Sequence, residues 1–329
     1  MISDTRLTID VSVEPLPLRR SFEISHMTIE SVDIVRLVVS GDGESGLGEI
    51  AADLGYGQDS RQIAQEAAAL AAQVDARGPR TTAELCAALL AAGDLASGPA
   101  RMLVEMAFLD RAAKQAGVPV WRLVDLPEPG EVRLLHTVPI GEEIPAAVRP
   151  VKIKLGGRDD DAVLAGLVGV PGPVILDVNC GWDAADWQRL RAVVTEIAPA
   201  VLEDPVRDRS LLAEIRAALP GTAVILDEGV NTAADVAAAI AIADGANTKL
   251  MRLGGLLPGR AVLTDLAERG ATRMLGCFLE PPRAIAYAAQ VAGLCDWTDL
   301  DGHFWLVDTE PVMSYRLDSS APGVPVIAA

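Results

Sequence analysis

The sequence predicts an α/β protein in which an N-terminal α+β module precedes a TIM-like (β/α)7β barrel. One observation is a change of pattern along the chain: residues 1–50 read as strands and residues 60–117 as helices, whereas short apolar runs alternate with helical stretches from residue 132 onward. A second is that most of these later runs end in a charged or polar residue at a nearly regular interval. Strands followed by helices favour an α+β module, and eight strands returned by helices favour a closed barrel.

The first part of the chain is expected to form the α+β module. The β-branched runs RLTIDVSVEPL and MTIESVDIVRLVVS read as strands, and GDGESGLGE reads as a tight turn between strands. Thr81 opens a sequence that resembles a helix capping box, and Gly117 stands where a helix-ending glycine belongs. The C-terminal stretch is strand-like and is expected to return to this module. The predicted domains are therefore 1–118 together with 311–329, and 119–310 for the barrel.

Eight apolar runs are the expected barrel strands: RLLHTVPI, PVKIKL, VILDVN, AVLED, AVILDE, NTKLM, RMLGCFL and TDLD. From Lys154, the strand-end residues Asp177, Glu203, Asp227 and Lys249 follow at intervals of 23, 26, 24 and 22 residues. A βα unit that returns to a parallel strand has roughly this length, so these ends are expected to meet at the C-terminal face of the barrel. Residues 141–151 alone separate the first two strands, which predicts a first helix of a turn or two.

Charged side chains at these strand ends form a candidate catalytic site. Lys152 and Lys154 point to the same side of one strand, because side chains alternate with period two. Counted around a ring of eight, their strand is the second and the strand of Lys249 is the sixth, so the two sets of lysines face each other across the mouth. The carboxylates of strands three to five lie between them.

Three converging carboxylates cannot share a site in their charged form without a cation. A site with oxygen ligands alone suits Mg²⁺. A divalent ion that holds a substrate carboxylate stabilises the enolate formed when the adjacent carbon loses a proton. Lysine is a poor base at its ordinary pKa of about 10.4, but a neighbouring cation lowers that pKa toward neutrality. Each motif alone is typical of an ordinary strand edge, and their order and spacing together favour the metal site.

Composition narrows the class of function. The net charge of −18 disfavours nucleic acid and anionic membranes as partners. The apolar stretches are shorter than the about 20 residues that cross a bilayer, and the N-terminus lacks the apolar core of a signal peptide. Four scattered cysteines without a CxxC pair favour a reduced, cytoplasmic protein. We therefore expect a small-molecule substrate, and the pattern leaves a homo-oligomer open.

These residues make the chain resemble the enolase superfamily, in particular its muconate-lactonising-type subgroup and, within it, the bacterial dipeptide epimerases of the L-Ala-D/L-Glu type. Lys152 and Lys154 match the family's KxK motif, and MLGCFLEPPRAIAYAAQ followed by DLDGHFWL resembles its seventh-strand and eighth-strand regions. The resemblance spans nearly the whole chain. It implies an N-terminal capping domain, Mg²⁺ as cofactor, and an isomerase that inverts the α-carbon of the C-terminal residue of a dipeptide.

The resemblance also implies a role for each site residue. The residues implied in chemistry are Lys154 and Lys249 as the two acid/base groups, Lys152 beside the enolate, and Asp177, Glu203 and Asp227 as metal ligands. The residues implied in substrate binding are Asp299 and Asp301, which match the pair that binds the α-ammonium group of the dipeptide, with Thr137, Cys277, Arg20 and His26. Two departures from the family stand out: Asp204 follows Glu203 where the family often has Gln, and no arginine after SFEISHM matches the one that some L-Ala-D/L-Glu enzymes use.

Other interpretations stay open beside this one. An N-acylamino-acid racemase or an o-succinylbenzoate-synthase-type dehydratase could use the same scaffold, and a non-catalytic, metal-bound barrel could bind peptides. The substrates of the first two have no free α-ammonium group, so the pair of Asp299 and Asp301 argues against them. Intact lysines on both faces argue against the third, because binding alone needs no such pair.

Overall fold

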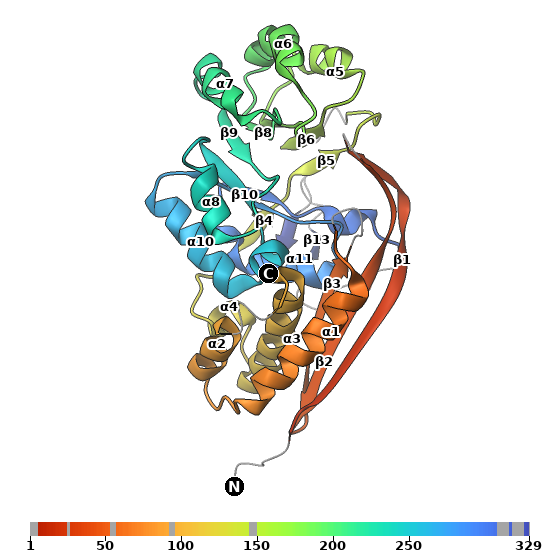
Figure 1. The fold of residues 1–329 in the computed structure, drawn as a ribbon, viewed down its shortest axis with the longest axis vertical. Coiled ribbons are helices and arrows are strands. Elements are labelled where there is room, and N and C mark those ends of the chain that lie inside the picture. Colours follow the sequence, from red (N-terminus) through yellow and green to blue (C-terminus); the bar gives the residue numbers. More distant parts are fainter. Residues whose placement is uncertain are drawn as a thin grey trace.

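The computed structural model describes residues 6–24, 27–52, 57–91, 96–144, 150–307, 316–317 and 326–328. The N-terminal strands are β1 (Thr8–Ile24), β2 (Met27–Gly41) and β3 (Glu44–Ala52), which pair antiparallel in that order. The helices that follow are α1 (Ser60–Ala76), α2 (Thr82–Leu90), α3 (Gly98–Ala116) and α4 (Val120–Leu123). Figure 1 shows the long β1–β2 hairpin running along one side of the molecule, from the N-terminal helices to the barrel.

Local sequence signals set the ends of these helices as predicted. Thr81 and Glu84 form a capping box at the start of α2, because each side chain accepts a hydrogen bond from the other residue's backbone N–H. Gly117 ends α3 in the left-handed region, at φ 65°. A residue without a Cβ adopts this conformation without strain.

The second sheet has eight parallel strands in chain order. They are β5 (His136–Val138), β6 (Val151–Lys154), β7 (Val174–Asp177), β8 (Val201–Glu203), β9 (Ala223–Leu226), β10 (Gly245–Lys249), β11 (Thr272–Gly276) and β12 (Trp297–Asp299). The helices around them are α5 (Asp160–Leu167), α6 (Ala184–Ile197), α7 (Leu212–Ala218), α8 (Ala233–Ala239), α9 (Leu250–Leu253), α10 (Leu256–Glu268) and α11 (Pro282–Ala288), with 3-10 turns η2 (Arg209–Leu211), η3 (Ala289–Leu294) and η4 (Gly302–Trp305). A hydrogen bond from Leu135 N to Thr298 O, at 2.9 Å, joins the first and last strands. The predicted barrel is confirmed.

The register of the strands brings the predicted site residues to one level. Lys154 pairs with Asp177, and Asp177 pairs with Glu203. On the other side, Gly276 pairs with both Lys249 and Asp299. Because the strands are parallel, these residues all lie at the C-terminal face of the barrel, which is the face where such barrels gather functional side chains.

The barrel interior beneath this level is apolar. Ile175, Val201 and Ile225 each lie two residues before one of the predicted metal-binding carboxylates, so they point to the same side of their strands. With Leu135 and Met274 they form a separate buried cluster. This layer keeps water from the lower side of the charged residues.

The described strands of the C-terminal segment lie beside a strand that precedes the barrel. β14 (Val326–Ala328) pairs antiparallel with both β4 (Glu131–Arg133) and β13 (Arg316–Leu317). The expected return of this segment to the N-terminal module stays a prediction, as do the domain boundaries at 118 and 310. Residues 145–149, where a shortened first barrel helix is expected, lie outside the described residues.

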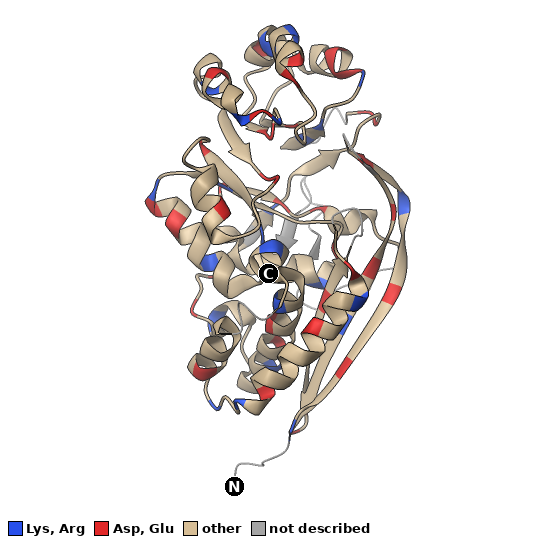
Figure 2. Cartoon of the chain, viewed as in Figure 1, with Lys and Arg blue, Asp and Glu red and all other residues tan. Residues whose placement is uncertain are grey.

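Charge is spread over the molecule. Figure 2 shows acidic residues on the barrel helices, on the N-terminal helices and along the β1–β2 hairpin, and not gathered in one patch. Among the described helices, none has both the length and the apolar character needed to span a bilayer.

A close approach between β3 and α3 gives a test of this packing. A Cβ on Gly48 would lie 2.1 Å from the backbone oxygen of Leu103, so Gly48→Ala should lower the free energy of unfolding by about 1–3 kcal/mol. Gly166 on α5 is the matched control: nothing lies within 4 Å of its added Cβ, and Gly166→Ala should be neutral or stabilising by up to about 1 kcal/mol. Denaturant unfolding measures both, and equal stabilities of the two variants would contradict this packing.

Candidate active site

A cavity opens at the C-terminal ends of the barrel strands, facing the β1–β2 hairpin. Its volume is about 660 Å³, the open mouth included. The barrel lines it with Thr137, Lys152, Lys154, Asn179, Lys249, Cys277, Asp299 and Asp301. Its apolar wall comes from the N-terminal strands and from the segments after β11 and β12: Phe22, Ile29, Val32, Ala51, Phe278, Leu279 and Trp305. The three predicted lysines and the predicted aspartate pair therefore share one cavity.

Lys152 is buried among three carboxylates. Its Nζ lies 2.9 Å from Asp177 Oδ2, 2.8 Å from Glu203 Oε2 and 2.6 Å from Asp299 Oδ2. Burial alone would lower the pKa of Lys152, but the charges of Asp177, Asp299 and Glu203 outweigh burial and raise that pKa well above 10.5. The lowered lysine pKa expected from the sequence therefore requires a cation at these carboxylates.

Lys154 lies on the same side of β6, as predicted, and shares a partner with Lys152. Its Nζ is 2.5 Å from Asp177 Oδ2 and donates to Asn179 Oδ1 at 3.1 Å. Burial would raise the pKa of Asp177, but the two lysines outweigh it and lower that pKa below its ordinary value. Asp177 is therefore ionised near neutral pH and accepts from both ammonium groups.

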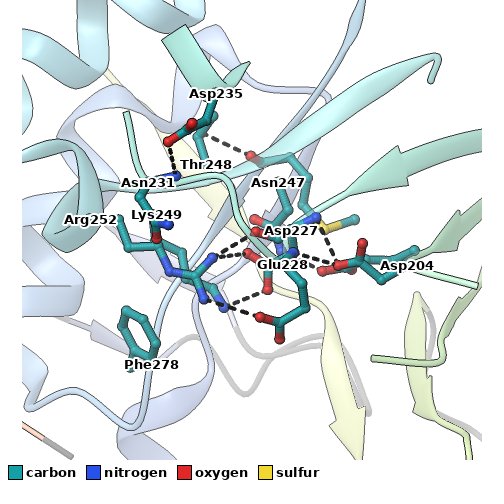
Figure 3. A network of polar contacts seen from close by, with 12 residues as sticks. Asp204, Asp227, Glu228, Asn231, Asp235, Asn247, Thr248, Lys249, Arg252 and Phe278 are labelled. Carbon is teal, nitrogen blue, oxygen red and sulfur yellow. Dashed lines mark hydrogen bonds and ion pairs between the residues drawn. The ribbon is translucent and has the colours of Figure 1, made fainter. Parts of the chain in front are cut away.

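Lys249 lies across the ring at the end of β10. Its Nζ is 2.7 Å from Asp227 Oδ2 and 4.7 Å from the centroid of the Phe278 ring. Arg252 Nη1 donates to Asp227 Oδ1 at 2.8 Å, and Figure 3 shows these side chains grouped together. Burial would raise the pKa of Asp227, but Lys249 and Arg252 hold it below its usual value. The two sides of the site thus contact different carboxylates.

Three carboxylates at the ends of β8 and β9 offer oxygen ligands to a metal. One oxygen each of Glu203, Asp204 and Asp227 lies within 4.8 Å of the other two. The sequence predicts Asp177, and not Asp204, as the ligand beside Glu203 and Asp227. In the structure, Asp177 contacts the ammonium groups of Lys152 and Lys154. Burial and the charge of Asp177 raise the pKa of Glu203 to about 7. Asn247, which the sequence did not single out, donates to Glu203 Oε1 at 2.8 Å.

Asp204 has a structural role that its place after Glu203 does not reveal. Its backbone is in the left-handed region at φ 42°. Its Oδ2 accepts hydrogen bonds from the backbone N of Asp227 at 2.9 Å and of Glu228 at 2.7 Å, so the side chain clamps the loop that carries Asp227. Its Oδ1 is buried and accepts no hydrogen bond from the described residues.

This set of carboxylate oxygens fits a hard divalent cation. All the candidate ligands are carboxylate oxygens, the type that Mg²⁺ prefers. Asp177, Glu203 and Asp227 remain the predicted ligands, with Asp204 as a fourth carboxylate beside them.

Asp299 and Asp301 lie together at the end of β12 and are held by Thr137. The backbone N of Thr137 donates to Asp301 Oδ2 at 2.7 Å, and its Oγ1 donates toward Asp301 Oδ1 at 3.1 Å and Asp299 Oδ1 at 3.3 Å. Burial and the charge of Asp299 raise the pKa of Asp301 to about 7. Both aspartates line the cavity, and a cation bound beside them would stabilise the charged form of Asp301.

The other predicted substrate-binding residues are Cys277, Arg20 and His26, and the described cavity lining includes Cys277 alone of these three. Cys277 lines the cavity, and burial with the charge of Asp299 raises the pKa of its thiol well above 9.0, which disfavours a role as nucleophile. Arg20 forms an ion pair with Glu142 at 2.9 Å and covers the Trp305 ring at 4.4 Å, with 60% of its side chain exposed. It is not among the residues that line the cavity. His26 lies outside the described residues.

A family comparison agrees with this geometry. Residues 143–317 match the family described as enolase C-terminal domain-like. The match covers more than half of the chain, and the chain belongs to this family.

Curated relatives narrow the class further. The chain is 27% identical to the L-Ala-D/L-Glu epimerase of Escherichia coli (strain K12), over 94% of this chain and 97% of that protein. It is 32% identical to a hydrophobic dipeptide epimerase of Citrifermentans bemidjiense, over 90% of this chain and 88% of that protein. These relatives are isomerases that act on amino acid derivatives, and they confirm the enzyme class and the resemblance predicted from the sequence.

Two solved structures share the fold over nearly the whole chain. An enolase family member from Agrobacterium tumefaciens with homology to dipeptide epimerases, with bound sodium and L-Ala-L-Glu, has a TM-score of 0.83 and 25% identity, and 98% of each chain is covered. A dipeptide epimerase from Methylococcus capsulatus, complexed with Mg and L-Arg-D-Lys, has a TM-score of 0.77 and 25% identity, over 99% of this chain and 98% of that chain.

Titration with Mg²⁺ distinguishes a ligand set that contains Asp177 from one that contains Asp204. Asp177→Asn should weaken Mg²⁺ binding at least about tenfold, which is a loss of about 1.36 kcal/mol of binding free energy. Asp204→Asn should change it by less than about threefold, because the amide oxygen can still accept from the two backbone N–H groups. Calorimetry on chelator-treated protein measures both. A larger loss in Asp204→Asn than in Asp177→Asn would put Asp204 among the ligands in the place of Asp177.

Proposed function

We propose that this chain is a Mg²⁺-dependent dipeptide epimerase that inverts the α-carbon of the C-terminal residue by 1,1-proton transfer. One observation carries the proposal: Lys154 and Lys249 line one cavity from opposite sides of the ring and contact different carboxylates. Inversion needs a base on one face of the α-carbon and an acid on the other, and a pair of opposed lysines meets this need. A peptide-binding protein has no use for such a pair.

The carboxylates and Lys152 would stabilise the intermediate. Asp177, Glu203 and Asp227 would hold Mg²⁺, which when bound supplies positive charge for an enolate of the substrate carboxylate. Lys152 lies against two of these carboxylates and adds a second positive group. Its proposed role is to donate a hydrogen bond to the developing enolate oxygen.

Lys154 and Lys249 would exchange roles with the direction of reaction. In one direction Lys154 takes the α-proton, and Lys249 gives a proton to the opposite face of the same carbon. In the other direction the two roles are reversed. One C–H bond breaks and one forms, so the reaction needs no oxidant, reductant or second substrate.

Asp299 and Asp301 would bind the free amine of the dipeptide. Two adjacent carboxylates suit an ammonium group through charge-assisted hydrogen bonds. An extended residue spans about 3.3–3.6 Å, so the amine of a dipeptide is one residue-length beyond the reacting residue. N-acylated substrates have no such cation, which argues against the racemase and dehydratase alternatives.

The proposal also covers which side chain the enzyme prefers on the C-terminal residue of the dipeptide. The resemblance favours the L-Ala-D/L-Glu type. The described cavity lining favours a second candidate, an apolar side chain, because its wall contains Phe22, Ile29, Val32, Leu279 and Trp305. The cations in the described lining are the three lysines that the reaction itself uses. A glutamate carboxylate against the apolar wall would lack a partner there and would be costly to bury.

The proposed partner is a small dipeptide, and the proposed location is the cytoplasm. All four cysteines are free thiols, which supports a reducing compartment.

Single-lysine variants test the two-base mechanism. Lys154→Ala and Lys249→Ala should each lower net epimerisation by about 10²–10⁴-fold, the usual contribution of a general acid or base. Each variant should still exchange the α-proton of one epimer with D₂O, because the remaining lysine reaches one face. Mass spectrometry of each epimer measures the exchange. Lys114→Ala, which removes a surface lysine paired with Asp110, is the control and should leave both activities unchanged. Wild-type rates in both active-site variants would refute the mechanism.

A panel of four substrates tests the two ends of the cavity: L-Ala-L-Leu, L-Ala-L-Glu and their N-acetyl forms. N-acetylation should lower kcat/KM at least about tenfold, because it removes the charge-assisted hydrogen bonds of the ammonium group to the aspartates, each worth about 1.5–3 kcal/mol. Asp301→Asn should penalise the free dipeptides and spare the N-acetyl forms. L-Ala-L-Leu should exceed L-Ala-L-Glu by at least about tenfold. Equal kcat/KM for free and N-acetylated compounds would favour the racemase, and a preference for L-Ala-L-Glu would favour the L-Ala-D/L-Glu type.

A further inference from the structure

Arg252 contacts the active site, although the proposed mechanism gives it no role. It lies on α9, directly after the strand that ends in Lys249. Its Nη1 donates to both the backbone oxygen and Oδ1 of Asp227, each at 2.8 Å. Its side chain is 9% exposed, and its guanidinium carbon is 5.1 Å from the centroid of the Phe278 ring. A second acidic group, Glu228, lies 3.9 Å from Nη2.

Arg252 and Lys249 share the same two neighbours. Lys249 Nζ contacts Asp227 Oδ2, and Arg252 Nη1 contacts Asp227 Oδ1. Both cations also face the Phe278 ring, a favourable arrangement for positive charge. Figure 3 shows Lys249 and Arg252 beside this carboxylate, with the Phe278 ring next to the two cations. With Arg252 bound to both the backbone and the side chain of Asp227, the carboxylate has little freedom to rotate, and the position of Lys249 depends on that carboxylate.

The position of Arg252 is itself fixed from the N-terminal module. Arg101 on α3 donates from Nη2 to the backbone oxygen of Leu253 at 2.8 Å, at the last residue of α9. Gly254 then ends α9 at φ 96°, and a Cβ there would collide with the guanidinium of Arg101. The helix that presents Arg252 is therefore held by contacts with α3.

We propose that Arg252 is a positioning residue for the Lys249 base, acting through Asp227 and Phe278. This inference rests on the proposed epimerase function. It predicts that loss of Arg252 slows proton transfer on the Lys249 face of the substrate more than on the Lys154 face, because Lys154 is held by Asp177 and Asn179 on the other side of the ring. A lysine at position 252 could keep the charge, but it has neither the planar group that faces Phe278 nor the rigid geometry of the guanidinium donors.

Face-resolved α-proton exchange tests this role. The two epimers of either Ala-Leu or Ala-Glu, whichever pair the wild type turns over faster, are incubated separately in D₂O at saturating Mg²⁺. The epimer whose exchange is lost in Lys249→Ala defines the Lys249 face. Arg252→Met should slow exchange of that epimer at least about tenfold and the other by less than about twofold. Arg252→Lys should lose activity on the same face to a smaller extent, and it serves as the second variant should Arg252→Met fold poorly.

Arg260 provides a matched control. It donates from Nη1 to the backbone oxygen of Val124 at 2.7 Å, in contact with neither lysine. Arg260→Met should leave the ratio of the two exchange rates unchanged. Equal slowing of both epimers in the Arg252 variants, or slowing of neither, would overturn the positioning role while leaving the epimerase proposal intact. Absence of exchange with every dipeptide in the wild type would instead refute the epimerase proposal, and this inference with it.

Discussion

The buried ammonium group of Lys152 binds together carboxylates that come from three different strands. It contacts Asp177 from β7, Glu203 from β8 and Asp299 from β12. An unpaired charge in a protein interior costs several kcal/mol, so these partners have to reach the same level of the barrel. The parallel register brings them there, and the apolar layer beneath excludes water from that side. The charge pairing on this side of the site follows from this buried contact, whereas Asp227 pairs with Lys249 and Arg252 on the other side.

The N-terminal module contributes to the site from two directions. Its hairpin supplies apolar side chains to the cavity wall. Its helix α3 contacts the end of α9 and the start of α10. Glu105 on α3 is buried and accepts hydrogen bonds from the backbone N–H groups of Leu256 and Leu257, at the start of α10, and from Tyr287 Oη at 2.7 Å. A carboxylate at a helix N-terminus satisfies donors that have no partner within the helix. Together with Arg101, it fixes the segment that presents Arg252 to Asp227.

The parts of the site that lie on strands could be predicted from the sequence. The spacing from Lys154 to Lys249 identified the barrel and its charged face, because period-two alternation and the length of a βα unit are local properties of the chain. The loop-borne contacts could not be predicted. Asp204 clamps its neighbouring loop through a left-handed backbone, and Arg252 reaches Asp227 through the docking of a one-turn helix. Both depend on long-range contacts that leave no periodic signal.

The pairing partner of the C-terminal strands could not be predicted from the sequence either. Their β character is visible in the sequence, but their partner, β4, is fixed by register over nearly 200 residues of intervening chain and not by local pattern. The apolar wall of the cavity also depends on contacts between distant parts of the chain. The residues Phe22 and Ile29 read as ordinary strand residues, and they become part of the cavity because the hairpin is long enough to reach the barrel.

Proton NMR of an L,L-dipeptide incubated with the wild-type protein and Mg²⁺ in D₂O tests the central claim most directly. It resolves the α-protons of the two residues separately. The account predicts that the signal of the C-terminal α-proton disappears while the L,D epimer accumulates, and that the α-proton of the N-terminal residue is retained. Exchange at the N-terminal residue, or exchange at the C-terminal residue with no L,D epimer formed, would contradict the account.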